Sequence, residues 1–459
     1  MSEQHSSEAS LVRCVISRNG KKQRALGDDM IASFVAHESI ESPFMAGSLM
    51  ISDSKNFLNT YPIQGGENIE MEVKSTFADK PYVYKFIIFS IGTRIVKNKT
   101  QVYILELISP EALINEGTRV QDPLTGNPEA IIKKMLGKEY LASTKDFFSE
   151  PSRFEIRLNP SRTRPFDVIS SLLRKCVSSK TTYVGKKYPK YKENRQNNRP
   201  NSDSKPIKGS AGFFFWETRR GYNFFSIDAL CDENGGKYSA PRLQTESWGP
   251  YVEKTANTDF SGDERFLIEN AVFNSEINLM ESLRKGKFSS LMVFFNHSTG
   301  QYEEFVYKIK DSYDNMAHLG GQDSVSLVPA NQIELSDFPT RVMSMVLDHE
   351  SWYNEPGIAN PEDKKAKDPT KFADWQKYYA AQGAARSELL KNQQGTLQLP
   401  GNPDICAGDK VDIRIASKLA DELRKTEPFD TEKRTSNLQQ TNVVFWELQD
   451  GADEANKIK

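Results

Sequence analysis

Apolar and polar residues alternate in short runs over the first quarter of the chain, and clusters of turn-forming residues such as Gly65 and Gly66 separate the runs. An alternation with a period of two places apolar side chains on one face of a strand and polar side chains on the other. The pattern therefore predicts strands over 13–17, 31–35, 47–51, 69–73, 82–90 and 101–107. Short strands at this even spacing favour an antiparallel barrel or sandwich over a parallel α/β sheet.

The period changes to a helical one between residues 127 and 231. One helix is predicted over 129–141, and another begins with Thr163 as its N-cap and Pro165 in its first turn. The apolar face of this second helix consists of Phe166, Ile169, Leu172, Leu173 and Cys176. Strands are predicted over 154–158, 212–217 and 223–228, with a hairpin turn over 219–222. The mixture indicates a small α+β domain.

The hairpin is unusually aromatic, because Phe213, Phe214, Phe215 and Trp216 face Phe224 and Phe225. This exceeds what one core-facing side of a sheet needs, so we expect both of its faces to be covered, one by the core and one by a neighbour or subunit.

Residues 185–209 form a polar segment with almost no apolar side chains, which predicts a long exposed loop. Its basic residues are Lys186, Lys187, Lys190, Lys192, Arg195, Arg199, Lys205 and Lys208, and Tyr183, Tyr188 and Tyr191 are interleaved with them. Such a mixture can bind phosphates and stack on bases. A solvated loop, or a docking contact to an acidic partner, explains the same residues and is the interpretation that we favour.

Strand patterns return beyond a boundary near 238–262. They cover 266–275, 289–296, 303–311 and 341–347, and 441–448 is a candidate final strand. A polar linker, 354–369, leads into a helix over 370–391, and Gly395 follows as a stop signal. The residues at helical spacing there are Phe372, Trp375, Tyr378, Tyr379, Gln382, Arg386 and Leu389.

Two distant segments, 63–73 and 405–415, align without gaps. Both contain Ile, then Gly followed by an acid, then apolar residues that alternate with charged ones. Gly66 and Gly408 can take the positive φ of a tight turn, and the alternation then buries one face of the strand that follows. Any turn that enters an amphipathic strand shows a similar pattern, but the match also suggests a duplicated β-domain.

Composition describes an ordinary globular protein. The chain has 459 residues and 37% hydrophobic content, enough for two to four domains. The 60 basic residues nearly balance the 62 acidic ones, giving a net charge of −2, so bulk charge indicates no general attraction to nucleic acid. The polar N-terminus has no apolar signal-like stretch, and no later run approaches the roughly 20 apolar residues of a membrane span. We expect a protein that starts in the cytoplasm and contacts no membrane.

Motifs that carry chemistry are missing from the sequence. The cysteines Cys14, Cys176, Cys231 and Cys406 form no CxxC pair, which predicts buried free thiols. The five histidines, His5, His37, His297, His318 and His349, show no metal-ligand spacing. No nucleophile elbow, P-loop or dinucleotide fingerprint occurs. The sequence thus predicts no catalytic, cofactor or metal site, and among its acids only Glu217 and Asp228 on the aromatic hairpin invite inspection as a carboxylate pair.

Several runs resemble one family. Residues 164–173 (RPFDVISSLL), 212–217 (GFFFWE) and 222–227 (YNFFSI) resemble the middle of T-even-type contractile-tail phage baseplate central hub proteins. Residues 384–386, 395–403 and 407–411 resemble the second barrel of these hubs and of their relatives, the VgrG-type spike hubs. The resemblance covers about residues 10–415. The closing strands after Ile415 do not match it, and the loop 185–209 resembles an insertion.

The resemblance implies a mainly β fold with α+β elements: two tube-like antiparallel β-barrel domains, an inserted α+β domain and a helical segment. It assigns 1–120 to the first barrel, 121–262 to the α+β domain, and 263–353 with 395–450 to the second barrel. Residues 354–394 are then a linker and helix inserted in that barrel, and 451–459 are a polar tail.

The resemblance also implies a non-enzymatic role in the virion, in a baseplate assembled in the host cytoplasm. Hubs of this kind are homotrimers whose six barrels form a pseudo-sixfold ring, which adapts the sixfold tail tube to the threefold central spike. The implied partners are the spike, the tail tube protein, the baseplate wedge proteins and the tape-measure protein, with nucleic acid present only transiently in the tube lumen. The alternatives are the hub of a secretion-system or tailocin spike and a tail-associated cell-wall hydrolase.

Overall fold

The structure is a computed structural model of the chain. It describes residues 9–18, 22–75, 80–97, 100–178, 184–185, 207–208, 210–231, 248–253, 266–275, 278–296, 300–311, 313, 327–328, 333–334, 339–346, 353–354, 372–391, 394–399, 401–402 and 404–414. Nearly all of the predicted loop 185–209, most of the linker 354–369, the candidate strand 441–448 and the tail 451–459 lie outside the described residues.

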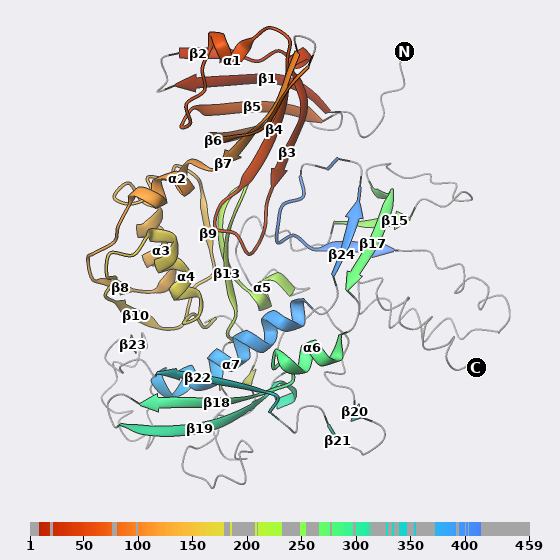
Figure 1. The fold of residues 1–459 in the computed structure, drawn as a ribbon. Helices are drawn as coiled ribbons and strands as arrows, with labels where there is room; N and C mark the ends of the chain where they lie inside the picture. The colour runs from red at the N-terminus through yellow and green to blue at the C-terminus, as the bar shows by residue number, and fades with distance from the viewer. Residues whose placement is uncertain are drawn as a thin grey trace, which may run out of the picture.

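The N-terminal part is a seven-stranded antiparallel sheet in the order β2-β1-β5-β6-β7-β4-β3 (Figure 1). Its strands are β1 (Ala9–Arg18), β2 (Lys22–Ala25), β3 (Ile31–His37), β4 (Ala46–Asp53), β5 (Asn68–Ser75), β6 (Tyr82–Lys97) and β7 (Thr100–Ile108). All six strands predicted for this region are confirmed. A 3-10 turn, Asp28–Met30, precedes β3, and a short helix, α1 (Phe57–Thr60), follows β4.

This sheet curves around its own core. Along β4, buried and partly exposed residues alternate, and Leu49 and Ile51 are fully buried. Phe34 on the edge strand β3 packs edge-on against Tyr84 of β6, with ring centroids 5.4 Å apart, although two strands, β4 and β7, separate β3 from β6 in the sheet order. Burying each large apolar side chain contributes roughly 1.5–3 kcal/mol, so the period-two pattern stabilises the sheet.

The α+β part follows. It contains α2 (Pro110–Gly117), β8 (Leu124–Gly126), α3 (Pro128–Leu136), β9 (Phe147–Ser149), β10 (Glu155–Leu158), α4 (Pro165–Leu173), β11 (Val184–Gly185), β12 (Ile207–Lys208), β13 (Phe213–Thr218), β14 (Gly221–Ser226) and α5 (Ile227–Cys231). The predicted hairpin is confirmed as β13 and β14, which pair from Phe213 opposite Ser226 to Thr218 opposite Gly221. β14 also pairs in parallel with β9.

Three local predictions in this part are wrong. The helix expected over 129–141 ends at Leu136, because Gly137 caps it in an extended conformation. Thr163 is not the N-cap of α4: Arg164 holds that position without a side-chain cap, while Thr163 forms a β-bridge with Val120. Asp228 lies in α5 and not on a hairpin strand, because β14 ends at Ser226.

The aromatic hairpin is covered on both faces, as predicted, and the chain itself supplies both covers. Phe213, Phe215 and Phe224 belong to the largest core cluster, which also contains residues of α3, α4 and α7. Trp216 and Phe225 belong to a separate small cluster, against which Ala407 packs. The hairpin therefore stands between two cores.

The second half of the chain contains short sheets around two helices. Its elements are β15 (Trp248–Glu253), β16 (Leu267–Ile268), β17 (Asn270–Ser275), α6 (Leu279–Arg284), β18 (Ser289–Asn296), β19 (Gln301–Lys308), the 3-10 turn Ile309–Asp311, β20 (Leu327–Val328), β21 (Ile333–Glu334), β22 (Arg341–Val346), β23 (Tyr353–Asn354), α7 (Phe372–Leu390), β24 (Gln394–Gln398) and β25 (Val411–Arg414). The strands predicted over 289–296 and 341–347 and the helix predicted over 370–391 are confirmed as β18, β22 and α7.

The prediction that Gly395 is the stop signal of the helix over 370–391 is wrong. Gly395 does not end the helix, because α7 already ends at Leu390 and Gly395 lies inside β24 opposite Phe273. A side chain at this position would meet the Phe273 ring, since a Cβ built on Gly395 lies 2.9 Å from it. The glycine therefore serves close strand packing.

The predicted fold class is confirmed: the structure is mainly β, with several antiparallel sheets and few helices. The division into two barrels and an inserted domain stays a prediction. The four cysteines are buried and form no disulfide, as expected. In the described part of the chain, no helix has both the length and the apolar character needed to span a membrane.

Candidate functional site

The two aligned segments, 63–73 and 405–415, contain turns that share a glycine conformation and a side-chain hydrogen bond, although Gly65 has a φ of 91° and the aligned Ala407 has no positive φ. Gly66 and Gly408 have φ values of 88° and 93°, in the left-handed region that glycine adopts at little cost. In the first turn, the backbone N–H of Gln64 donates to Glu67 Oε1 at 2.9 Å. At the aligned positions of the second turn, the N–H of Cys406 donates to Asp409 Oδ2 at 3.0 Å. The acid after each glycine thus closes its own turn.

In each turn, an arginine donates hydrogen bonds to the acid and to a backbone carbonyl oxygen. Arg18 donates from Nε and Nη2 to Glu67 Oε1 at 3.1 and 2.6 Å, and from Nη2 to the carbonyl oxygen of Pro62 at 2.5 Å. Arg220 donates to the two carboxylate oxygens of Asp409 at 3.1 and 2.9 Å, and from Nη2 to the carbonyl oxygen of Asp404. We call each arginine with its acid and carbonyl an arginine clamp.

The two clamps agree position by position. Pro62 and Asp404, whose carbonyls accept, are aligned, and so are the acids Glu67 and Asp409. Both acids are nearly fully buried, with side chains 1% and 2% exposed. A turn that merely enters a strand requires no arginine, so the two turns share more than the sequence pattern alone predicts.

The clamps differ in where the arginine comes from. Arg18 is the last residue of β1, which pairs with β5, and β5 begins directly after Glu67. Arg220 lies in the turn between β13 and β14, so the α+β part supplies the arginine for the second turn. The first turn is therefore closed locally, and the second joins two parts of the chain.

The N-terminal sheet holds the second turn as well. Glu38 accepts from the backbone N–H of Ala407 at 3.0 Å through Oε2, and from that of Arg219 at 2.6 Å through Oε1. Tyr82 of β6 donates its hydroxyl to Asp404 Oδ1 at 2.8 Å, and the guanidinium of Arg219 lies 4.5 Å from the centre of the Tyr82 ring. The second turn thus contacts the first sheet and the hairpin at once.

Trp216 fixes the other side of this turn. Its Nε1 donates to the carbonyl oxygen of Ala407 at 2.9 Å. A Cβ built on Gly408 would lie 2.7 Å from the Trp216 ring, whereas a Cβ on Gly66 would meet nothing within 4 Å. Gly408 is therefore required both by its backbone conformation and by the closeness of the indole.

Burial and hydrogen bonds shift the pKa values of Glu38, which contacts the second turn, and Glu67, which closes the first turn, in opposite directions. Burial raises the pKa of Glu38, although the N–H groups of Ala407 and Arg219 partly oppose it. Burial also acts to raise the pKa of Glu67, but the hydrogen bonds from Gln64 and Arg18 outweigh it, so this pKa is lowered. Burial raises the pKa of the Cys406 thiol to about 12, which leaves that thiol protonated at neutral pH.

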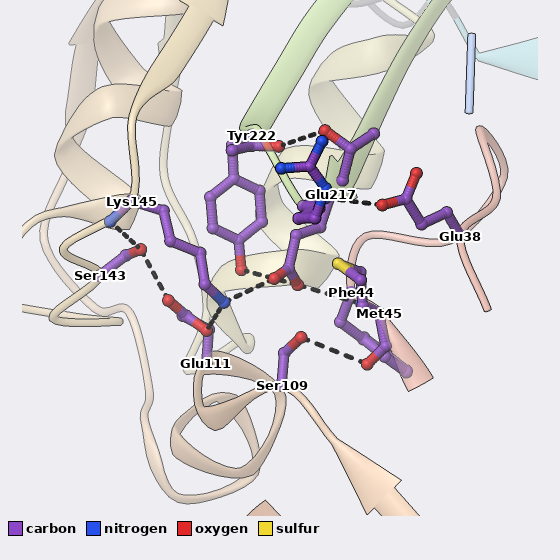
Figure 2. Close-up of polar contacts among 12 residues, drawn as sticks. Glu38, Phe44, Met45, Ser109, Glu111, Ser143, Lys145, Glu217 and Tyr222 are labelled. Atoms are coloured by element: carbon purple, nitrogen blue, oxygen red, sulfur yellow. Dashed lines mark hydrogen bonds and ion pairs between the residues drawn. The ribbon is translucent and has the colours of Figure 1, made fainter. Parts of the chain in front are cut away.

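A second polar network lies where β4, α2 and the hairpin meet (Figure 2). Lys145 Nζ bridges Glu111 Oε2 at 2.6 Å and Glu217 Oε1 at 2.5 Å. Glu217 Oε2 accepts from the backbone N–H of Met45 at 3.0 Å, and from the Tyr222 hydroxyl at 3.5 Å. Figure 2 shows these groups directed at Glu217 from different elements. Glu217, one of the two acids singled out in the sequence, therefore links Met45 of the N-terminal sheet to the α+β part.

Asp228, the other acid singled out, forms a buried ion pair with Arg386 of α7. Arg386 donates to its two carboxylate oxygens at 3.0 and 2.7 Å, and their side chains are 2% and 0% exposed. The structure therefore places Glu217 and Asp228 in separate ion pairs, each with its own cation. Within the described residues, no cluster of His, Cys, Asp or Glu could hold a metal ion.

Sequence reasoning missed the cations of these networks: Arg18, Lys145, Arg220 and Arg386. Only Arg386 carried a usable signal, because it lies with Gln382 on the same face of α7 as apolar residues. Gln382 is buried too, and its Oε1 accepts from the backbone N–H of Ala211 at 2.8 Å. Polar residues four apart on an otherwise apolar helix face predict buried partners.

No family model matches the chain, and no curated protein matches it. Among solved structures, it is similar to the prophage MuSo2 43 kDa tail protein from Shewanella oneidensis, at 9% identity over 89% of each chain with a TM-score of 0.42. It is also similar to a tail protein from Neisseria meningitidis MC58, at 11% identity over 88% of this chain and 86% of that one, with a TM-score of 0.43. It is similar as well to the Francisella PdpA-VgrG complex, at 9% identity with a TM-score of 0.34, and the match covers 74% of this chain and 40% of that one. Because these TM-scores and identities are low, no functional conclusion rests on the similarities.

Proposed function

We propose that this chain is a structural hub of a contractile phage tail baseplate, in which three copies form a ring that joins the sixfold tail tube to the threefold central spike. The observation that carries the proposal is the pair of arginine clamps, whose acids and accepting carbonyls occur at aligned positions on two segments more than 300 residues apart, although the arginines themselves are not aligned. Two equivalent β-units per chain, taken three times, give six equivalent positions around a threefold axis. A ring of this kind matches a sixfold partner on one side and a threefold partner on the other.

The buried charges are consistent with a scaffold. Each of the acids Glu217 and Asp228 neutralises a cation and is almost fully buried, so neither presents a carboxylate to a substrate. A glycosidase needs two carboxyl groups that flank a sugar bond. We therefore propose a non-enzymatic role, with the spike, the tail tube protein and the baseplate wedge proteins as partners in the virion.

Light scattering on the purified full chain, alone and mixed with its spike partner, tests the assembly. We expect three times the monomer mass in at least one of the two conditions, and class averages from electron microscopy should show six similar lobes around the ring. A stable monomer in both conditions contradicts the proposal.

Incubation with peptidoglycan separates the scaffold from a cell-wall hydrolase. We expect no soluble muropeptides from the full chain, under conditions in which lysozyme releases them. Release that is lost in a Glu217→Gln variant of unchanged stability would assign the chain to the hydrolases instead.

A further inference from the structure

The sheet formed by β18, β19 and β22 has two apolar faces. α7 packs against one of them (Figure 1), where Met292, Phe294 and Tyr307 are at most 1% exposed and join the main core cluster. Strand residues alternate between the faces of a sheet, so the neighbours of these buried residues point to the opposite face. We call that opposite face the outer face.

The strand register defines the outer face. Its three rows are Leu291 with Val306 and Val342, Val293 with Glu304 and Ser344, and Phe295 with Tyr302 and Val346. Seven of these nine residues are apolar or aromatic, whereas a solvent-facing sheet side is normally polar. Tyr302, Val342 and Val346 are 75%, 66% and 58% exposed. A contiguous apolar surface of this kind marks an interaction site.

The size of the face restricts what can cover it. Three strands at about 4.8 Å spacing, with three outward residues each at about 6.8 Å, give a face of roughly 15 by 20 Å, or about 300 Å². Stable dimers bury about 800 Å² on each partner, so the face is too small to join two copies of the chain by itself. A single helix about 10 Å wide covers it with about 14 residues, at 1.5 Å per residue. The sheet already accepts one helix, α7, on its other face.

The charge on the face restricts the partner further. Glu304 is the single acid among the nine positions, and it is exposed at the middle row of the edge strand β19. An apolar partner placed over the face would bring a basic residue within reach of this carboxylate at the rim. We propose that the outer face is the docking site for an amphipathic helix of a partner protein, whose apolar stripe covers the sheet and whose Lys or Arg pairs with Glu304.

The test uses the full chain and a labelled 18-residue peptide with Leu at helical stripe spacing and Lys on its flanks. The comparison peptides are a scrambled version and one with Glu in place of Lys. We expect the Lys peptide to bind, and both comparison peptides to bind at least tenfold more weakly. The double change Val342→Ser with Val346→Ser should weaken binding about tenfold, since it removes apolar contact area. Val83→Ser, at an exposed valine of β6, is the matched control and should change nothing.

Two further measurements address the charge and the other occupants. Glu304→Gln should reduce the preference for the Lys peptide over the Glu peptide by at least about threefold. Because the native cysteines are buried, Ser344→Cys reports on the middle row of the face, at the edge strand β22: maleimide should label it quickly, and the peptide should slow the labelling. Ser170→Cys, exposed on α4, should label at the same rate with and without peptide.

Three outcomes overturn the proposal. Equal binding of the scrambled peptide shows that the face does not select a helix. A dimer or trimer that Val342→Ser dissociates shows that another copy of the chain is the occupant. Slow labelling of Ser344→Cys without peptide, in a variant that remains folded, shows that the chain covers the face itself.

Discussion

Arg386 and Asp228 form a two-bond ion pair at 3.0 and 2.7 Å that joins α7 to α5, although 158 residues separate them in the chain. Arg386 Nη1 also donates to the carbonyl oxygen of Ala211 at 3.0 Å, just before the aromatic hairpin. Burial acts to lower the pKa of Arg386, but the charge of Asp228 and its hydrogen bonds raise it. Arg386 therefore keeps its positive charge inside the core.

Replacing Arg386 with Met should strongly destabilise the protein. The change leaves Asp228 buried without its cation, and breaking a buried pair in this way costs about 3–5 kcal/mol. Urea denaturation of the two proteins measures the difference in unfolding free energy. The double variant Arg386→Met with Asp228→Leu should recover most of the loss, because both charges are then removed together.

The matched control is Lys391→Gln, one residue beyond the end of α7. Lys391 pairs with Glu41 at 2.6 Å, and the two side chains are 43% and 56% exposed. Surface pairs contribute about 0–1 kcal/mol, so this variant should unfold almost as the wild type does. Equal effects of Arg386→Met and Lys391→Gln would show that α7 does not depend on the buried pair.

Substituting alanine for each turn glycine separates backbone strain from side-chain contact. Gly66→Ala should cost about 1–2 kcal/mol, because Ala disfavours the positive φ and nothing else obstructs it. Gly408→Ala meets the same strain and also the Trp216 ring, so it should cost about 1–3 kcal/mol more. Thermal unfolding measures both, and a shift in tryptophan emission should accompany only Gly408→Ala. Indistinguishable stabilities would contradict the close packing of Trp216.

Replacing the two clamp arginines should have effects in different places. Arg18→Gln should speed hydrogen exchange of the backbone amides in the turn 64–67 alone, because that clamp lies within one sheet. Arg220→Gln should speed the exchange of Cys406 and Ala407, since the second turn then loses one of its two attachments to the hairpin and keeps only the bond from Trp216. Each loss of a charge-assisted bond costs about 1–3 kcal/mol. If either variant speeds exchange equally in both turns, the clamps are not independent.

Glu67 and Glu38 should show opposite pH dependences. The folded-state pKa of Glu67 is lowered, so its stabilisation is present above the ordinary glutamate value of 4.5 and is lost as pH falls through the folded pKa. The deficit of Glu67→Gln relative to wild type should therefore be largest near pH 7 and shrink below pH 4.5. Unfolding free energies measured across this range provide the test, and a deficit that grows on acidification would contradict the lowered pKa.

The contribution of Glu38 to the free energy of unfolding changes with pH in the opposite direction to that of Glu67. Burial raises its folded-state pKa, so its contribution is fully present below 4.5 and is lost as pH rises through the raised pKa. Wild type should therefore gain stability relative to Glu38→Gln as pH falls toward 4.5. A constant difference between these two proteins across the range would show that Glu38 titrates alike in the folded and unfolded chains.

The strands of the N-terminal sheet could be predicted because each buries one face. In β4, the period-two pattern of the sequence matches the alternation of buried and partly exposed residues along the whole strand. The hairpin was predictable for a similar reason, since its turn residues separate two aromatic strands. Local patterns of this kind require no knowledge of distant partners.

The polar networks could not be predicted because their partners are far apart in sequence. The chain has 62 acidic residues, and no sequence pattern around Asp228 indicated that it pairs with Arg386. The paired turns are an intermediate case: the alignment identified both glycines and both acids, but Arg18 and Arg220 follow no shared pattern around them. Distant contacts of this kind are set by the fold and not by local propensity.

The different origins of the clamp arginines imply an order of events during synthesis. Arg18 precedes Glu67 by 49 residues, so the first turn can close soon after it leaves the ribosome. Arg220 precedes Asp409 by 189 residues. At a synthesis rate of about 5–20 residues per second, Asp409 is added roughly 10–40 s after Arg220. We expect nascent chains stalled before residue 404 to carry a folded N-terminal sheet beside a hairpin whose arginine still lacks this acid.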